Sequence, residues 1–170
     1  MPNIHTIKHG FLQIFSPSIL LTLHGIFLFV SVGLFFASLP FDCFYRGNQL
    51  QKSPVGPGIW LLMMGWLGIF EKQFAWYTNP FLFVTWITMC IRTSRKVPFC
   101  CAIAAFALAF SFVFYGDTLA NESGGRANIV GYGPGYWFWL SSTFIALIGC
   151  VFGLIAKKRL PRSIQSSFWF

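Results

Sequence analysis

The chain has few charged residues for its size. Only 9% of its 170 residues are charged and only four are acidic, whereas about a quarter of the residues in an ordinary soluble domain carry charge. Hydrophobic residues make up 56% of the chain, more than a single soluble core of this size could bury. The scarcity of charge therefore excludes an ordinary soluble domain and predicts an integral membrane protein.

Aspartate, glutamate, lysine and arginine are missing from the middle of every long apolar run. Ion-coupled transporters and proton pumps generally place such groups there, so both classes are disfavoured. Hydroxyls in helices mostly donate to the carbonyl one turn back. The polar residues within the runs are Thr22, His24, Ser31, Asn79, Thr85, Thr88, Ser111, Ser141, Ser142 and Thr143.

Patterns that would carry catalysis or hold a cofactor are also missing. The five cysteines include no Cys-x-x-Cys, and Cys43 alone lies in an expected loop. Bacterial disulfide-generating quinone reductases need cysteine pairs in outer loops, so that class is rejected. A membrane haem site needs axial ligands on facing helices, and only His24 lies within a run. We expect no metal or cofactor, and expect His24 to bond a carbonyl or a polar group such as Asn79.

Four apolar runs are long enough to cross a bilayer, which takes about twenty residues of helix. Ser16 and Pro17 before the first run are typical of a helix start. The connecting stretches 40–58 and 116–135 are rich in glycine, proline and polar residues, and are expected to be outer loops. The sequence predicts an all-α bundle of four transmembrane helices in one membrane domain, residues 1–170. The expected spans are residues 19–39, 74–91, 97–115 and 136–156.

A shorter apolar run, residues 59–70, leaves the number of spans open. As a helix it would be only about 18 Å long, which favours a re-entrant or interfacial segment and four spans with both termini in the cytoplasm. A five-span alternative makes it a full crossing and starts the chain outside. The two topologies agree on everything after Phe74. Residues 1–15 fit either an interfacial amphipathic helix or a flexible terminus.

The distribution of basic residues supports a defined orientation but does not decide between the two topologies. Lysine and arginine collect in cytoplasmic loops. The five-span alternative separates basic residues between the two sides of the membrane at least as well, so their distribution does not reject it. The short length of 59–70 and the short charged break at 71–73 are what favour four spans. All four acids then lie outside, in the periplasm of a bacterial inner membrane. The basic residues expected inside are Lys8, Arg92, Arg95, Lys96, Lys157, Lys158, Arg159 and Arg162.

The stretch 65–80 is the expected binding surface. Pro80 removes a backbone donor and is expected to kink the second span. Asn79 beside it could repair the freed backbone, bond another helix or contact a substrate. The candidate interaction or conduit residues are Trp66, Glu71, Trp76, Asn79 and Pro80, together with His24.

Short segments carry a resemblance that covers about a fifth of the chain. They are Gly65-Trp-Leu-Gly68, Gln73-Phe-Ala-Trp76, Asn79-Pro80 and Gly133-Pro-Gly-Tyr136. In these the chain resembles small uncharacterised bacterial membrane proteins with four spans. The resemblance implies topology only, since it brings no activity with it.

Three functions fit these observations. The first is a non-enzymatic accessory or immunity-type subunit that binds another membrane protein or a second copy of itself, with no nucleic-acid partner. The second is a small oligomeric transporter or channel for a small molecule or lipid. The third, a lipid-directed enzyme, would need acids such as Asp42, Glu71 and Glu122 to act together. Three small-residue patterns could pack the bundle or an oligomer: Gly33-x-x-x-Ala37, Ala105-x-x-x-Ala109 and Gly149-x-x-x-Gly153.

Overall fold

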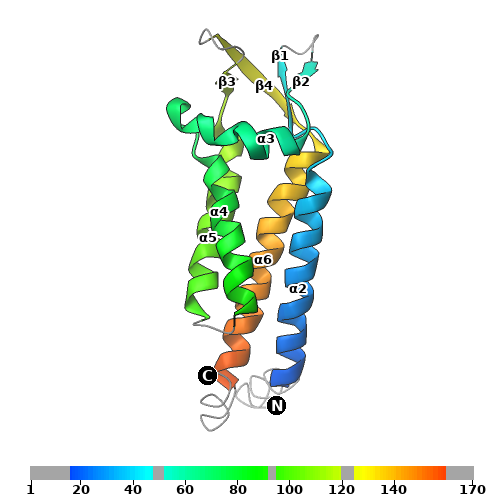
Figure 1. Ribbon diagram of the computed structural model, residues 1–170, viewed down its shortest axis with the longest axis vertical. Coiled ribbons are helices and arrows are strands. Elements are labelled where there is room, and N and C mark those ends of the chain that lie inside the picture. The colour runs from blue at the N-terminus through cyan, green and yellow to red at the C-terminus, as the bar shows by residue number, and fades with distance from the viewer. Residues whose placement is uncertain (1–15, 48–51, 92–94, 120–124, 160–170) are drawn as a thin grey trace, which may run out of the picture.

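A computed structural model describes residues 16–47, 52–91, 95–119 and 125–159. The expectation for residues 1–15 lies outside these ranges. Four helices run alongside one another down the long axis of the molecule (Figure 1). They are α2 (Pro17–Ser38), α4 (Thr78–Cys90), α5 (Lys96–Ser111) and α6 (Pro134–Arg159).

The long apolar runs form these helices. Three segments, Pro17–Ser38, Lys96–Phe114 and Pro134–Lys158, are long and apolar enough to cross a membrane. Lys96–Phe114 includes a short 3-10 turn, η3 (Phe112–Phe114), that continues α5. The expected span 74–91 is shorter than predicted, because α4 has 13 residues and begins after a 3-10 turn, η2 (Ala75–Tyr77).

Small residues allow the helices to approach closely. Ala105 and Ala109 of α5 are fully buried. Gly149 and Gly153 of α6 lie so close to α2 that a Cβ on Gly153 would come within 2.8 Å of the His24 ring. Two of the three small-residue patterns therefore serve the bundle itself. The third, on α2, faces outward, and a Cβ on Gly33 would meet no atom within 4 Å.

The short apolar run forms α3 (Gly58–Met64), which continues as a 3-10 helix, η1 (Gly65–Glu71). This segment lies across one end of the bundle and is not aligned with the four long helices (Figure 1). The crosswise placement agrees with a segment that does not form a fifth crossing. Its outward side carries large exposed apolar side chains, including Trp60, Met63 and Phe70.

The two connections expected to be loops instead carry a four-stranded antiparallel sheet, so the chain is mostly helical but not all-α. The strand order is β2-β1-β4-β3. The sheet joins distant parts of the chain, since β1 pairs with β4 through partners such as Arg46 and Ile129. The strands are β1 (Phe44–Gly47), β2 (Lys52–Pro54), β3 (Asp117–Leu119) and β4 (Arg126–Tyr132).

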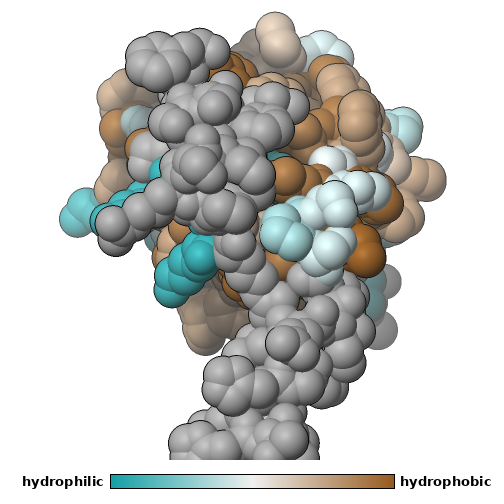
Figure 2. Space-filling model, turned by 90° about the horizontal axis from the view of Figure 1, so that it is seen from below, coloured by the Kyte–Doolittle hydropathy of each residue, from teal (hydrophilic) through white to brown (hydrophobic). Residues whose placement is uncertain are grey.

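The two ends of the molecule differ in charge. The sheet and α3 occupy one end, here the sheet end, while α2 begins and α6 finishes at the other, here the basic end (Figure 1). Figure 2 looks onto the basic end and has hydrophilic residues on that face, with hydrophobic residues around the sides. Described charged side chains at the basic end are all basic and include Arg95, Lys96, Lys157 and Lys158, whereas the sheet end carries both signs: Asp42 and Asp117 together with Arg46, Lys52, Lys72 and Arg126.

Candidate functional site

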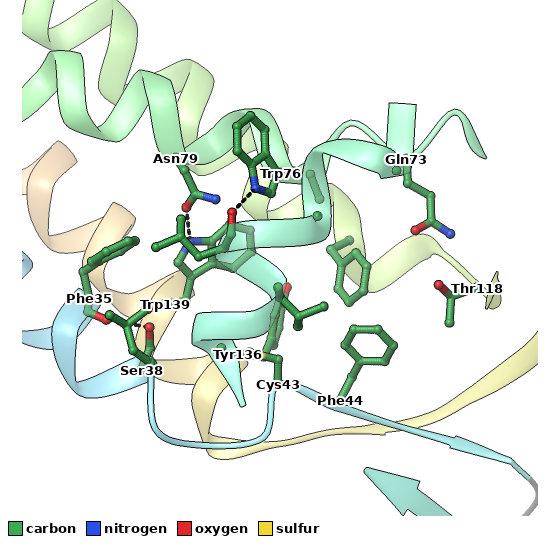
Figure 3. Close-up of a pocket in the computed structure, with 18 of the residues that line it drawn as sticks. Phe35, Ser38, Cys43, Phe44, Gln73, Trp76, Asn79, Thr118, Tyr136 and Trp139 are labelled. Carbon is green, nitrogen blue, oxygen red and sulfur yellow. Dashed lines mark hydrogen bonds between the residues drawn. The ribbon is translucent and has the colours of Figure 1, made fainter. Parts of the chain in front are cut away.

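A cavity of about 250 Å³ lies at the sheet end, between α3 and the ends of the long helices (Figure 3). Its wall combines segments that are far apart in the sequence: the end of α2, strand β1, the α3–η1 segment, and the beginnings of α4 and α6. Phe35 and Ser38 lie at one end of the cavity in Figure 3, and Gln73 and Thr118 lie at the other. The cavity is partly open, and its wall is therefore assembled only in the folded chain.

The lining is mostly apolar and aromatic. No charged side chain of the described residues lines the cavity. A charged ligand would lose its hydration there without gaining a counter-charge, so the lining favours an uncharged one. The aromatic residues of the lining are Phe35, Phe44, Trp76, Phe112, Tyr136 and Trp139.

Most polar side chains of the lining already donate to backbone carbonyls. These bonds hold the wall together and use the single donors of Ser38, Trp76 and Tyr136, whereas Gln73 uses one of its two N–H donors. The four bonds are Ser38 Oγ to Phe35 O (2.6 Å), Gln73 Nε2 to Asp117 O (3.1 Å), Trp76 Nε1 to Leu62 O (2.9 Å) and Tyr136 OH to Ala109 O (3.1 Å).

Asn79 differs from these residues. Its side-chain oxygen accepts a hydrogen bond of 2.9 Å from the Trp139 indole nitrogen, which links α4 to α6. Among the residues that the structure describes, its amide nitrogen has no hydrogen-bond acceptor. Asn79 is only 5% exposed and lines the cavity (Figure 3). The site thus contains one buried amide that has free donors.

The local sequence explains how Trp76 reaches this wall. A Cβ on Gly65 would lie 2.5 Å from the Trp76 ring, so glycine is needed where α3 passes into η1. Lys72, with a φ of 59°, then ends η1 in the left-handed conformation and turns the chain toward α4. The charged break at 71–73 is therefore the point where the crosswise segment ends and the bundle resumes.

The expected kink at Pro80 is wrong. Pro80 is the third residue of α4 and lies in its first turn, where a helix has no internal partner for the backbone N–H and tolerates proline. The chain changes direction earlier, through the 3-10 turn η2. Asn79 consequently has no freed carbonyl to repair, and instead bonds another helix.

Cys43 lines the cavity as well. Burial, with a smaller contribution from the negative charge of Asp42, raises the pKa of the Cys43 thiol to about 12. The thiol is neutral at physiological pH, and a neutral thiol is a poor nucleophile. Cys43 therefore acts here as a small apolar part of the wall.

His24 lies near the opposite end of the bundle. Its Nδ1 is 2.8 Å from the Gly149 carbonyl and its Nε2 is 2.7 Å from Arg95 Nη1. A guanidinium can only donate, so Nε2 accepts and Nδ1–H donates to the carbonyl. The expected carbonyl partner is confirmed, whereas the expected bond to Asn79 is wrong. Arg95 was expected in a surface loop, but it is only 8% exposed.

The six candidate residues thus do not form one site. Trp76 and Asn79 lie together in the cavity wall, but Trp66 points outward and is 48% exposed. Only the backbone of Glu71 is described, at the end of η1. His24 is remote from the cavity, and Pro80 does not line it.

Sequence reasoning missed several lining residues. Ser38, Cys43, Tyr136 and Trp139 belong to the cavity wall but lie in segments distant from the predicted surface. The expectation for hydroxyls holds where they bond their own helix, as Thr88 does to Val84 O at 2.6 Å. Among described residues there is no group of three or more His, Cys, Asp or Glu placed to hold a metal ion.

No protein-family model, curated protein or solved structure matches this chain.

Proposed function

We propose that the chain is a four-span protein of a bacterial inner membrane that binds an uncharged, apolar small molecule in the cavity beside α3. The observation that carries the proposal is the cavity, with its volume of about 250 Å³ and its uncharged, aromatic lining. Small-molecule sites are concave and mostly apolar, with a few placed polar groups. A cavity of about 150 Å³ accommodates benzene, so this one suits a ligand of about ten carbon atoms.

Charge supports the orientation of the proposed topology. Lysine and arginine favour the cytoplasmic side, which assigns the basic end to the cytoplasm and the sheet end to the periplasm. The crosswise α3–η1 segment then lies in the outer interface. Exposed side chains such as Trp60 and Phe70 would contact lipid there, as aromatic residues commonly do.

Two earlier hypotheses have less support. The accessory-subunit hypothesis drew on small-residue grooves, but Ala105 and Gly153 are used inside the bundle. The conduit hypothesis needs Asn79 and His24 on one path. Asn79 bonds Trp139 near the sheet end, whereas His24 bonds Arg95 near the basic end. Both hypotheses remain predictions, and of the three small-residue patterns only the one at Gly33 on α2 faces outward, where a partner could pack.

A photoreactive hydrocarbon tests the binding proposal. The purified chain in lipid nanodiscs would be labelled with an alkyl diazirine of about ten carbons. Cavity labelling should saturate, since the site holds one molecule, whereas lipid-facing labelling should rise in proportion to the probe. We expect saturable labelling at the buried residues Phe112 and Tyr136 and non-saturable labelling at their exposed neighbours Phe114 and Trp137.

A matched pair of variants makes the test specific. Ala75 is buried and lines the cavity, so Ala75→Leu should fill part of the volume and abolish the saturable labelling. Ala107 is exposed on α5, and Ala107→Leu should leave it unchanged. Labelling at Phe112 and Tyr136 that never saturates in the wild-type chain would refute the binding proposal.

A further inference from the structure

The buried amide of Asn79 carries information about the chemistry of the ligand. An indole nitrogen can only donate a hydrogen bond. The atom of Asn79 that faces Trp139 Nε1 at 2.9 Å must therefore be the oxygen. The bond therefore determines which side-chain atom of Asn79 is the oxygen and which is the nitrogen, a choice that is made from the hydrogen-bond network. The two N–H donors of Nδ2 then point away from Trp139 Nε1.

Those donors face the open space of the cavity. Within the described part of the chain, no fully enclosed side-chain nitrogen or oxygen lacks a hydrogen-bond partner. The Asn79 nitrogen has no partner among those residues, so it cannot be fully enclosed. Since the residue is only 5% exposed and lines the cavity, the nitrogen is reached from inside the cavity. An acceptor on a ligand in the cavity could therefore reach this nitrogen and supply the partner that the protein does not.

We propose that the cavity takes an uncharged, lipid-soluble molecule whose carbonyl oxygen accepts a hydrogen bond from Asn79 Nδ2. This inference rests on the proposed function and names the ligand class for the same site. A carbonyl supplies an acceptor and brings no donor of its own. An alcohol would add an O–H that needs an acceptor beside Asn79, whose own oxygen already accepts from Trp139, and a carboxylate or phosphate would add a charge that no lining residue neutralises.

Two kinds of membrane compound offer this chemistry. One is the ester of an acyl lipid, in which the carbonyl ends an apolar chain. The other is a quinone, in which the carbonyl is part of a flat ring that could stack on the aromatic wall. The shared feature is a neutral carbonyl on an apolar body of about ten carbons, as judged from the cavity volume.

Competition against the saturable diazirine labelling tests the inference. The competitors are decane, decan-2-one and decan-1-ol. They are compared at equal concentrations in the membrane, so that differences in their partitioning between water and lipid do not affect the comparison. A neutral hydrogen bond changes affinity by about three- to tenfold. We expect the ketone to compete about three- to tenfold better than decane in the wild-type chain, and better than the alcohol.

Two variants assign the preference to the amide. Asn79→Leu should make the ketone and decane equal, because it removes the donor and keeps the number and branching of the side-chain heavy atoms. Thr85→Val is the control, since Thr85 is a buried residue of the same helix that bonds Phe81 O and does not line the cavity. It should retain the ketone preference. The wild-type comparison alone decides the inference if Asn79→Leu does not fold.

Methyl nonanoate and a short-chain benzoquinone distinguish the two sources. Either one competing better than decane supports the inference, and the stronger competitor identifies the source. Equal competition by ketone and decane, or stronger competition by the alcohol, would overturn the carbonyl assignment while leaving the cavity-binding function intact. Absence of saturable labelling would instead refute the proposed function itself.

Discussion

Single polar side chains join the helices at a few points inside the bundle. Ser31 of α2 donates from Oγ to the Ser142 carbonyl at 2.8 Å and accepts from the Trp86 indole nitrogen at 2.9 Å. One hydroxyl therefore connects α2 with α6 and α4. Because Ser31 is fully buried, no water is available to replace it.

Replacing Ser31 should measurably destabilise the bundle. Ser31→Ala leaves the Trp86 N–H and the Ser142 carbonyl without this partner, and a buried unsatisfied group costs about 1–3 kcal/mol. We expect a fall of that size in the free energy of unfolding, measured by denaturant titration in detergent. Ser111→Ala is the control, because Ser111 bonds only a carbonyl of its own helix. An equal effect of the two substitutions would contradict this account.

Cys43 should react slowly with thiol reagents. Its pKa of about 12 lies about three units above the ordinary value, so the thiolate fraction near pH 8 is about a thousandfold lower. In a chain whose other cysteines are alanine, maleimide labelling of Cys43 should be far slower than that of Ser53→Cys on exposed β2 in a Cys43→Ala background.

The same pKa predicts a dependence of stability on pH. The folded thiol stays protonated up to about pH 12, whereas the unfolded thiol loses its proton near pH 9, its ordinary value. The contribution of Cys43 to stability is therefore complete below pH 9 and declines as the pH rises toward 12. A Cys43→Ala variant should show a smaller alkaline decline in thermal unfolding than the wild-type chain, and an unchanged decline would contradict the assignment.

At the scale of elements, the most extensive contact among the long helices is between α2 and α6. His24 fits against Gly153, where a side chain would collide with its ring. The same ring bonds the Gly149 carbonyl and Arg95. The glycine therefore matters for more than close packing, because it gives the imidazole the space in which both bonds form.

Two glycine substitutions test this packing. Gly153→Ala should displace the His24 ring and lower the free energy of unfolding by about 1–3 kcal/mol, the usual cost of overpacking. Gly33→Ala on the outward face of α2 meets no neighbour and should be neutral, or stabilising by up to about 1 kcal/mol from helix propensity. Thermal unfolding of both variants in one detergent checks the difference, and equal effects would contradict it.

Helices were predictable from the sequence and the sheet was not. An uninterrupted apolar run such as 136–156 permits little except a helix in a membrane, and α6 covers it. The strands have three to seven residues and lie among glycines and prolines that indicate turns. Their pairing joins segments distant in sequence, so no local pattern reveals it.

The candidate site was predicted in part. Trp76 and Asn79 stand out locally, as an aromatic belt residue and as a polar residue in an apolar run, and both line the cavity. Cys43 and Trp139 lie there only because the fold brings distant segments together. Arg95 was missed for a related reason: in the sequence it is one of several basic residues, and only the folded chain buries it against His24.

At the scale of the whole molecule, the orientation can be tested with two introduced cysteines in a cysteine-free chain. Ser53→Cys lies in β2 at the sheet end and Lys158→Cys is exposed at the basic end. A membrane-impermeant maleimide should label the first in intact spheroplasts and the second only after permeabilisation. The reverse pattern would invert the topology, and labelling of both in intact spheroplasts would exclude an odd number of crossings between them, such as the three that the four-span topology requires.

The pairing of β1 with β4 has a consequence for biosynthesis. β1 precedes α3, and β4 immediately precedes α6. During synthesis, the β1–β2 hairpin therefore waits for its partner until α3, α4 and α5 have been made. Contacts so distant in sequence form late. The cavity, whose wall includes residues of both β1 and α6, is completed only when the last helix has been made, so a truncated nascent chain lacks the complete cavity wall.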